Sequence, residues 1–458
     1  MHSDDAAQTA DAVPGDVGLL SAVSIDAADV VADAVVLHRL ADAEAALMRA
    51  YVAIGAAPAS VADAAAALIS SPMRVDLVEL AAAAVHGGNP IIPLLPHLAE
   101  RVREHDVAAA TWLHRGATSQ DIVDTALMLV VQGGARRAAA GLRRAADAAL
   151  GLADRHRDDS AIARTLTQHA VPTTLGLKAA RWALALDAAA TELDELAAAL
   201  PAQLGGAGGT LASFVELLGA ERAAELPAVF AREVGLAAPL APWHSERAPV
   251  MRAAGALGRA TAATGFVASD VALMARTELG EAIVGAGGGS SAMPHKRNPV
   301  DAVLIRSAAM RAPGLVSTLF LAGGLAVDER ADGAWHAEWP ALRELTGLAV
   351  GAAERAAVLL EGLSLSPQQA RRHLDASAAG VVSERFAIVL APLIGATSAT
   401  AVARQLAEGA RPEAIVREYP ELADIDLAAL RDPDAYRGLA PELTDRLTRH
   451  IRARREIS

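Results

Sequence analysis

The chain has 458 residues, a formal net charge of −13 and no cysteine. The acidic balance argues against nucleic-acid binding as the main task, because nucleic-acid-binding proteins carry a basic surface. The lack of cysteine removes disulfides, thiolate metal sites and a cysteine nucleophile. Because the chain also shows no apolar run of membrane-spanning length and no signal-peptide pattern, the sequence predicts a soluble, cytoplasmic protein.

Helical patterns dominate the chain from about residue 27 onward. Residues 1–22 form a polar, Ala- and Asp-rich tail that we expect to be disordered. A helical stretch follows at about 27–54, and the prolines and glycines after it predict short helices and turns. Longer helices are predicted at about 119–156, 173–200, 246–283, from 300 onward and at 339–363, and shorter ones after residue 366. We find neither strand-type alternation nor a short repeat.

This pattern predicts an all-α protein with a central bundle of long helices between two smaller helical regions. The expected division is a disordered tail (1–22), an N-terminal helical domain (23–115), a central bundle domain (116–364) and a C-terminal helical domain (365–458). Alanine-rich helices can approach closely but supply little bulk. We therefore expect burial to be shared between subunits.

The Gly-rich segment 285–301 is the most informative stretch of the sequence. The chain has only two lysines and two asparagines, and one of each, Lys296 and Asn298, lies here. An ammonium is a compact point charge that the planar fork of arginine cannot replace at a tight site. Ser290 and Ser291 add hydroxyls beside glycines that allow close backbone approach. The order of residues is not that of a phosphate-binding Walker loop. An ordinary surface turn is the alternative.

Two further polar clusters precede long helices, at residues 114–121 and 164–174. Hydroxyls and free backbone N–H groups at a helix start bind carboxylates well, because the helix dipole and the unpaired donors both favour negative charge. The hydroxyls of the first cluster, Thr118 and Ser119, could equally be plain helix caps. The second cluster could equally be a solvated loop between helices.

In this order and spacing, the three clusters resemble the signature regions of the fumarase/aspartase superfamily. Residues 289–299 match its hallmark loop, and 118–125 and 164–174 match the first and second regions. The resemblance implies an all-α fold with a central long-helix bundle and a homotetramer whose active sites are each shared by three subunits. It also implies a small-molecule substrate and no cofactor, and the histidines show no metal-ligand spacing, so we expect no metal.

Within the superfamily, the chain most resembles the 3-carboxy-cis,cis-muconate cycloisomerases. The matching stretches are residues 114–126, 205–207, 242–244 and 335–339. That family implies conversion of 3-carboxy-cis,cis-muconate to 4-carboxymuconolactone in aromatic catabolism. Adenylosuccinate lyase, or another amine-eliminating relative that releases fumarate, is the close alternative. A non-enzymatic member is a third, against which an intact Ser290, Lys296 and Asn298 argue.

The resemblance implies a role for each residue of these clusters. Ser290 would remove the α-proton, and Lys296 and Asn298 would stabilise the resulting aci-carboxylate. The residues expected to contact a tricarboxylate substrate are His114, Thr118, Ser119, Gln168, His169, Ser291, Met293, Arg297, Arg330, Trp335 and His336. Two alternatives stay open: Arg330 could form a surface ion pair with Asp328 or Glu329, and Trp335 could belong to a packed helix face.

One departure from the resemblance bears on the leaving group. Adenylosuccinate lyases carry a histidine directly after Arg-Thr in the second region, and that histidine protonates the leaving group. This chain has Leu166 there, which cannot donate a proton. A lactone opens by expelling a carboxylate, a stable anion because its acid has a pKa of roughly 4. Leu166 therefore favours lactonisation over amine elimination, unless His169 substitutes as the acid.

Overall fold

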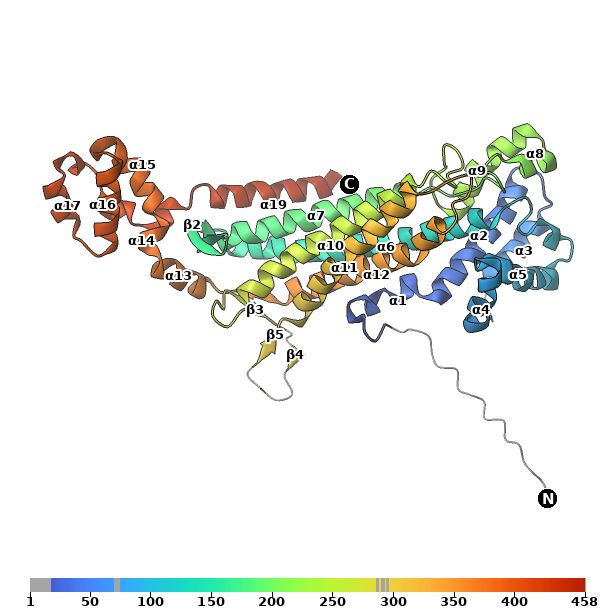
Figure 1. Cartoon of the computed structure of the whole chain (residues 1–458), viewed down its shortest axis with the longest axis horizontal. Coiled ribbons are helices and arrows are strands. Elements are labelled where there is room, and N and C mark those ends of the chain that lie inside the picture. Colours follow the sequence, from blue (N-terminus) through green and yellow to red (C-terminus); the bar gives the residue numbers. More distant parts are fainter. Residues whose placement is uncertain (1–17, 70–74, 286–287, 290–292, 294–295, 458) are drawn as a thin grey trace, which may run out of the picture. The chain divides into compact units, whose positions relative to one another are not determined.

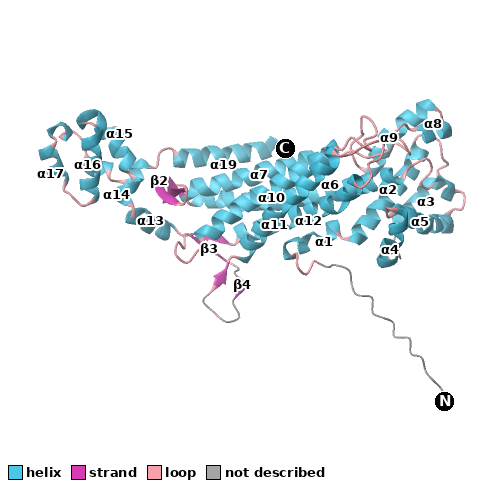
Figure 2. Ribbon diagram, in the orientation of Figure 1, coloured by secondary structure: helices cyan, strands magenta, loops and turns pink. Residues whose placement is uncertain are grey.

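The computed structural model describes residues 18–69, 75–285, 288–289, 293 and 296–457 (Figure 1). These residues form mainly helices, with short two-stranded sheets (Figure 2), which confirms the all-α prediction. No helix among them is long and apolar enough to cross a membrane. Most of the predicted tail (1–17) and the serines 290 and 291 lie outside the described residues.

Contacts between residues divide the chain into two compact units, each built from three segments. Unit 1 comprises Met1–Arg136, Asp194–Gly258 and Arg311–Gly351, and unit 2 comprises Arg137–Leu193, Arg259–Met310 and Ala352–Ser458. Several long helices continue from one unit into the other. The division into a tail and three domains that the sequence suggests stays a prediction.

Unit 1 contains the N-terminal helices and one part of each long helix. Its elements are η1 (Ala22–Ala27), α1 (Ala28–Val31), α2 (Asp33–Ala53), α3 (Ser60–Ile69), α4 (Leu77–Gly87), α5 (Ile91–His105), η2 (Ala109–Trp112), α8 (Ala212–Leu218), α9 (Ala220–Val234) and parts of α6 (Ser119–Arg155), α7 (Leu175–Ala199), α10 (Ala248–Met274), α11 (Val300–Gly324) and α12 (Ala334–Glu361). α2 packs against α3 and α9 through a fully buried core that includes Leu47, Met48 and Phe230.

Small residues let the helices of unit 1 approach closely. A Cβ atom added at Gly134 of α6 would lie 2.2 Å from Cγ2 of Thr346 on α12. No side chain fits in that space, so glycine is required there although it weakens an isolated helix. The same spacing explains how a chain with few aromatic residues can still pack tightly.

Unit 2 contains the other parts of the long helices together with all the strands. Its strands are β1 (Ser160–Thr165), β2 (Gln168–Thr174), β3 (Ala282–Val284), β4 (Gly288–Gly289), β5 (Arg297–Asn298) and β6 (Leu363–Leu365). They pair antiparallel as β1–β2, β3–β6 and β4–β5. Its C-terminal elements are α13 (Pro367–Ala376), α14 (Ala378–Val381), α15 (Ser383–Ile394), α16 (Ala396–Ala407), α17 (Pro412–Glu418), η3 (Pro420–Leu422), α18 (Leu427–Leu430), η4 (Pro433–Tyr436) and α19 (Ala440–Ile457).

The long helices begin and end near their predicted positions, with two differences. α10 ends at Met274 rather than near residue 283, because residues 282–284 pair with β6. α12 begins at Ala334, five residues before the predicted start, and contains Pro340 inside the helix. Residues 164–174 also differ from expectation: they form most of a β-hairpin and not a plain loop.

Candidate active site

The first polar cluster lies at the start of α6, where the buried carboxylate of Asp121 holds the surrounding backbone. It accepts the Thr118 N–H at 3.0 Å and the two N–H groups of the turn 205–206 at 2.8 and 3.0 Å. His244 Nε2 lies 2.8 Å from the same carboxylate. These contacts fix Thr118 and Ser119 at the N-terminus of a 37-residue helix. Unpaired N–H groups at such a terminus attract anions.

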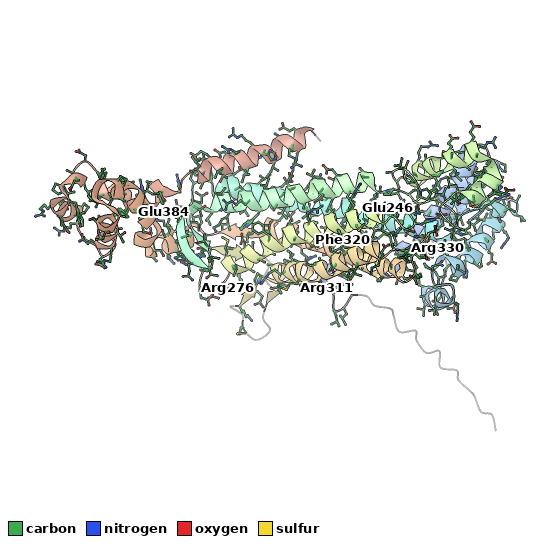
Figure 3. All side chains as sticks on the ribbon, turned by 45° about the horizontal axis from the view of Figure 1, so that its top comes forward. Glu246, Arg276, Arg311, Phe320, Arg330 and Glu384 are labelled. Atoms are coloured by element: carbon green, nitrogen blue, oxygen red, sulfur yellow. The ribbon has the colours of Figure 1, made fainter. Side chains whose placement is uncertain are left out.

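Arg330 adds a positive charge to this helix start. Its guanidinium donates a hydrogen bond to the Thr118 hydroxyl; Arg330 is labelled in Figure 3. Guanidinium groups and helix N-termini are both good partners for carboxylates. The contact with Thr118 places Arg330 at this helix start, and substrate binding by Arg330 stays a prediction.

His114, just before this cluster, is paired with a fully buried carboxylate. Its Nδ1 lies 2.5 Å from Glu44 Oε1, and its backbone N–H donates to Glu44 Oε2 at 3.1 Å. Burial opposes the charge on the imidazole, but the Glu44 carboxylate outweighs burial and raises the pKa of His114 above its ordinary value. The pair therefore keeps His114 positively charged to a higher pH than a free histidine.

We expect replacement of His114 by glutamine to destabilise the protein in a pH-dependent way. Because the folded-state pKa is raised, the contribution of His114 to stability is complete below the ordinary histidine pKa and is lost as pH rises through the raised value. The free energy of unfolding should thus fall by about 1–2 kcal/mol at pH 6 and by less at pH 9. Urea unfolding at both pH values measures this difference, and an equal loss at both would contradict it.

The second cluster forms the β1–β2 hairpin, whose two-residue turn is strained. Leu166 and Thr167 have φ angles of 48° and 73°, the left-handed conformation that such turns require and that Asn-Gly usually supplies. For a β-branched residue such as Thr167 this conformation is costly, and such strain concentrates at functional sites. The turn leaves Leu166 96% exposed. Gln168, next to it, donates to the Thr167 hydroxyl at 3.2 Å.

Two basic side chains, Arg164 and His169, flank this turn, and both have partners within unit 2. Arg164 donates two hydrogen bonds, at 2.9 and 2.6 Å, to the fully buried Glu281. His169 Nδ1 lies 2.7 Å from Ser377 Oγ. Partial burial and the nearby Arg164 charge lower the pKa of His169, which favours its neutral form. A neutral imidazole is a weaker candidate for the general acid that Leu166 cannot be.

The third cluster is closed by a short pair of strands. Gly288 pairs with Asn298 and Gly289 with Arg297. The residues on either side of the two serines in the sequence therefore lie next to each other. Lys296 and Arg297 are exposed, and Asn298 is partly buried. Met293, which accepts a hydrogen bond from the Lys296 N–H at 3.0 Å, is 42% exposed. Ser290 and Ser291 lie outside the described residues, so their predicted roles stay predictions.

Comparison with known proteins decides the family. Residues 25–314 match the model of a family described as lyase. This chain belongs to the lyase family. The fold and the relatives place it in the fumarase/aspartase superfamily, as the resemblance suggested.

The relatives of this lyase carry two different activities in their names. It is 44% identical to a nitrosuccinate lyase from Streptomyces davaonensis, over 94% of each chain. It is 39% identical to a 3-carboxy-cis,cis-muconate cycloisomerase from Bradyrhizobium diazoefficiens, over 90% of this chain and 92% of the other. A crystal structure of the 3-carboxy-cis,cis-muconate lactonizing enzyme from Pseudomonas putida superposes with a TM-score of 0.83 at 34% identity, covering 95% of this chain and 99% of the other.

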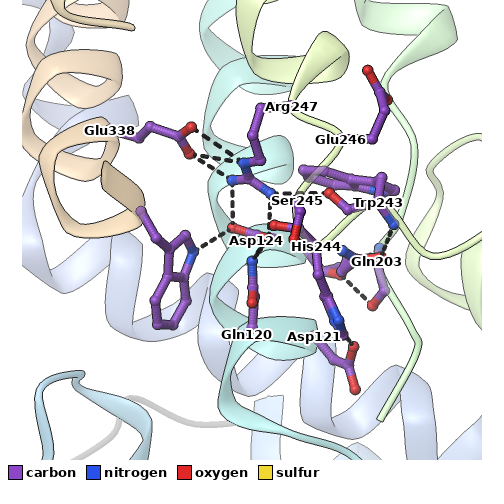
Figure 4. A network of polar contacts seen from close by, with 12 residues as sticks. Gln120, Asp121, Asp124, Gln203, Trp243, His244, Ser245, Glu246, Arg247 and Glu338 are labelled. Carbon is purple, nitrogen blue, oxygen red and sulfur yellow. Dashed lines mark hydrogen bonds and ion pairs between the residues drawn. The ribbon is translucent and has the colours of Figure 1, made fainter. Parts of the chain in front are cut away.

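Behind the first cluster of the lyase lies a buried ionic network that joins three helical segments (Figure 4). The Arg247 guanidinium donates to both oxygens of Asp124, at 2.8 and 3.0 Å, and to Glu338 at 2.6 to 3.2 Å. All three side chains are almost fully buried. Burial opposes the charge on Arg247, yet the two carboxylates outweigh it and raise its pKa. The network fixes α6, the start of α10 and α12 relative to one another within unit 1.

Trp335 belongs to this network. It is 4% exposed, and its indole N–H donates to Asp124 at 2.9 Å, which agrees with a packed helix face. Its ring also packs at 4.6 Å from Trp339 and 5.2 Å from His336, centroid to centroid. His336 is more exposed, and its Nε2 lies 2.9 Å from the Gly88 carbonyl oxygen. Substrate contact by Trp335 and His336 stays a prediction.

The sequence did not single out two of the charged residues that organise these clusters. Arg247 is one of many arginines, and its partners lie 123 and 91 positions away, so no local pattern reveals it. Lys178 is the second lysine of the chain. The rarity of lysine, which drew attention to Lys296, was the signal that could also have drawn attention to Lys178.

Proposed function

We propose that this lyase forms or breaks a bond β to a carboxylate and releases a group that is already a stable anion. The observation that carries the proposal is Leu166 at the turn of the second cluster. A leucine cannot protonate a leaving group, and the neutral state favoured for His169 makes it a poor replacement. Only a leaving group that needs no proton suits such a site.

The first candidate substrate is 3-carboxy-cis,cis-muconate. One carboxylate of the substrate attacks the double bond, which closes the lactone ring and leaves the electron pair on the α-carbon as an aci-carboxylate. A proton then adds to that carbon and gives 4-carboxymuconolactone. Ser290 carries this proton, while Lys296 and Asn298 stabilise the negative charge of the intermediate. Relatives that are 39% identical and the lactonizing-enzyme structure support this candidate.

The second candidate is nitrosuccinate, which the relative that is 44% identical favours. Ser290 would remove a proton α to one carboxylate, and the C–N bond on the neighbouring carbon would then break. The nitro group leaves with its electron pair as nitrite, and fumarate remains. Nitrite is the anion of an acid that is fully ionised at neutral pH. Leu166 is therefore as compatible with this elimination as with lactonisation, and amine elimination is the reaction that it disfavours.

We further propose that the active site is completed by other copies of the chain, in a homotetramer. The long helix α11 exposes apolar side chains along its length, among them Met310 (72%), Phe320 (48%) and Leu321 (60%); Phe320 is labelled in Figure 3. Exposed apolar surface of this kind marks protein interfaces. The substrate-binding residues of the first, second and third clusters would then come from three different subunits.

A substrate panel tests the function directly. Purified protein is mixed separately with 3-carboxy-cis,cis-muconate, nitrosuccinate and adenylosuccinate. Loss of the conjugated-diene absorbance, release of nitrite, and release of fumarate with the amine are followed in turn. We expect turnover of the first or the second substrate and none of the third. Efficient turnover of adenylosuccinate would overturn the argument from Leu166, and inactivity on all three would favour a non-enzymatic member.

A further inference from the structure

A pocket of about 530 Å³ lies beside the strained hairpin turn in unit 2. Its wall is formed by the second cluster, by the first turns of α7 and by the end of α10. The polar and charged residues that line it include Arg164, Thr167, His169, Lys178, Asp270 and Arg276, and Arg276 is labelled in Figure 3. Thr167 is the residue with the left-handed backbone, so the strained part of the turn faces this pocket.

Lys178 and Arg276 are the cations of this pocket without a direct side-chain partner among the described residues, and of the two only Lys178 is partly buried. Among the residues that the structure describes, no hydrogen bond or ion pair involves the Lys178 ammonium group. Arg164, by contrast, is held by Glu281 through two hydrogen bonds. Asp270, a carboxylate that interacts with Lys178 electrostatically, accepts the indole N–H of Trp182 at 2.8 Å. An ammonium that faces an open pocket without a bound counter-ion can accept an incoming anion.

The electrostatic environment of Lys178 supports this reading. Burial lowers the pKa of Lys178, against the opposing effect of the Asp270 and Glu281 carboxylates. Removal from water is therefore not fully compensated by the charges already present. An anion that entered the pocket would supply the missing compensation, since opposite charges at close range favour the ionised form. The carboxylates of Asp270 and Glu278 also line the pocket and offset part of its positive charge.

We propose that this pocket is the subsite that receives the small oxyanion expelled by the lyase, and that Lys178 is the charge that holds it. The inference rests on the function proposed above, because it explains how a site without a proton donor at residue 166 stabilises the departing group. The ligand is a carboxylate or nitrite group. In lactone opening that carboxylate stays attached to the product, whereas in elimination from nitrosuccinate the nitrite is released free.

The kinetic test compares Lys178→Met with Arg181→Met. Arg181 lies one turn further along α7, is exposed and does not line the pocket, so it controls for the loss of a positive charge. We expect Lys178→Met to lower kcat about 100-fold, the effect typical of removing one group that stabilises developing negative charge, with a smaller change in KM. Lys178→Arg should recover part of the loss. Unchanged kcat in Lys178→Met would overturn the proposal.

A binding test on the resting protein separates failure of this inference from failure of the proposed function. The chain has two lysines, so acetylation by a neutral acetyl ester, followed by peptide mass spectrometry, reports on Lys178 and Lys296 individually. At constant ionic strength, acetate or nitrite should slow acetylation of Lys178 and leave Lys296 unaffected relative to chloride. Stronger protection by nitrite would favour elimination from nitrosuccinate, and stronger protection by acetate would favour lactonisation. Equal labelling of Lys178 in all three salts would overturn the subsite, whether or not the enzyme turns over any substrate of the panel.

Discussion

Replacement of Arg247 by methionine should cost this protein about 3–5 kcal/mol of unfolding free energy. The substitution removes the shared partner of Asp124 and Glu338, which are both almost fully buried. Two carboxylates would then remain in the protein interior without a counter-charge. Their desolvation is far more costly than the loss of an exposed ion pair. Urea unfolding at a fixed protein concentration measures the change.

The matched control is Arg259→Met on α10. Arg259 pairs with Glu192, and the two side chains are 62% and 34% exposed, so the loss of Arg259 should cost at most about 1 kcal/mol. A similar cost for the two variants would show that the Arg247 network is not buried in solution.

The loss caused by Arg247→Met should also depend on pH. Burial already raises the pKa of Glu338, although Arg247 opposes that rise. Without Arg247 the folded-state pKa rises further. A group whose folded pKa is raised stabilises the fold below its unfolded pKa, and this contribution is lost as pH rises through the folded value. The deficit of the variant should therefore be smaller near pH 5 than near pH 8.

The sequence was sufficient for the features that depend on local patterns. The helix after Thr118 and Ser119 is continuous to Arg155, as its periodicity predicts, because good helix formers and a cap act over neighbouring residues. The predicted start of α12 was five residues late, and Pro340 lies inside the helix. The hairpin at residues 160–174 was missed because the turn pair Leu166-Thr167 lacks the Asn or Gly that marks a two-residue turn.

The sequence was not sufficient for the interactions between distant residues. Arg164 and Glu281 are 117 positions apart, and Lys178 on α7 lines the same pocket as Asp270 on α10, so neither arrangement leaves a local trace. The motifs of the three clusters were nevertheless visible, because a site that binds anions concentrates hydroxyls, glycines and a rare lysine in short segments. Local chemistry therefore indicated which segments could form the site, and only the fold indicated which charges have a direct partner.

Replacement of Ser290 by alanine should lower kcat by at least about 1,000-fold, within the range that a positioned acid or base contributes. Both candidate reactions move a proton at a carbon α to a carboxylate. Elimination forms the aci-carboxylate by removing that proton, and lactonisation ends by adding it, so each reaction needs a group that carries the proton. The matched variant Ser291→Ala removes a hydroxyl predicted to bind substrate, so it should mainly raise KM. Size-exclusion chromatography should show the same oligomer for both. Near-normal kcat in Ser290→Ala would mean that another group carries the proton, and the hydroxyl at 290 would then act at most in binding.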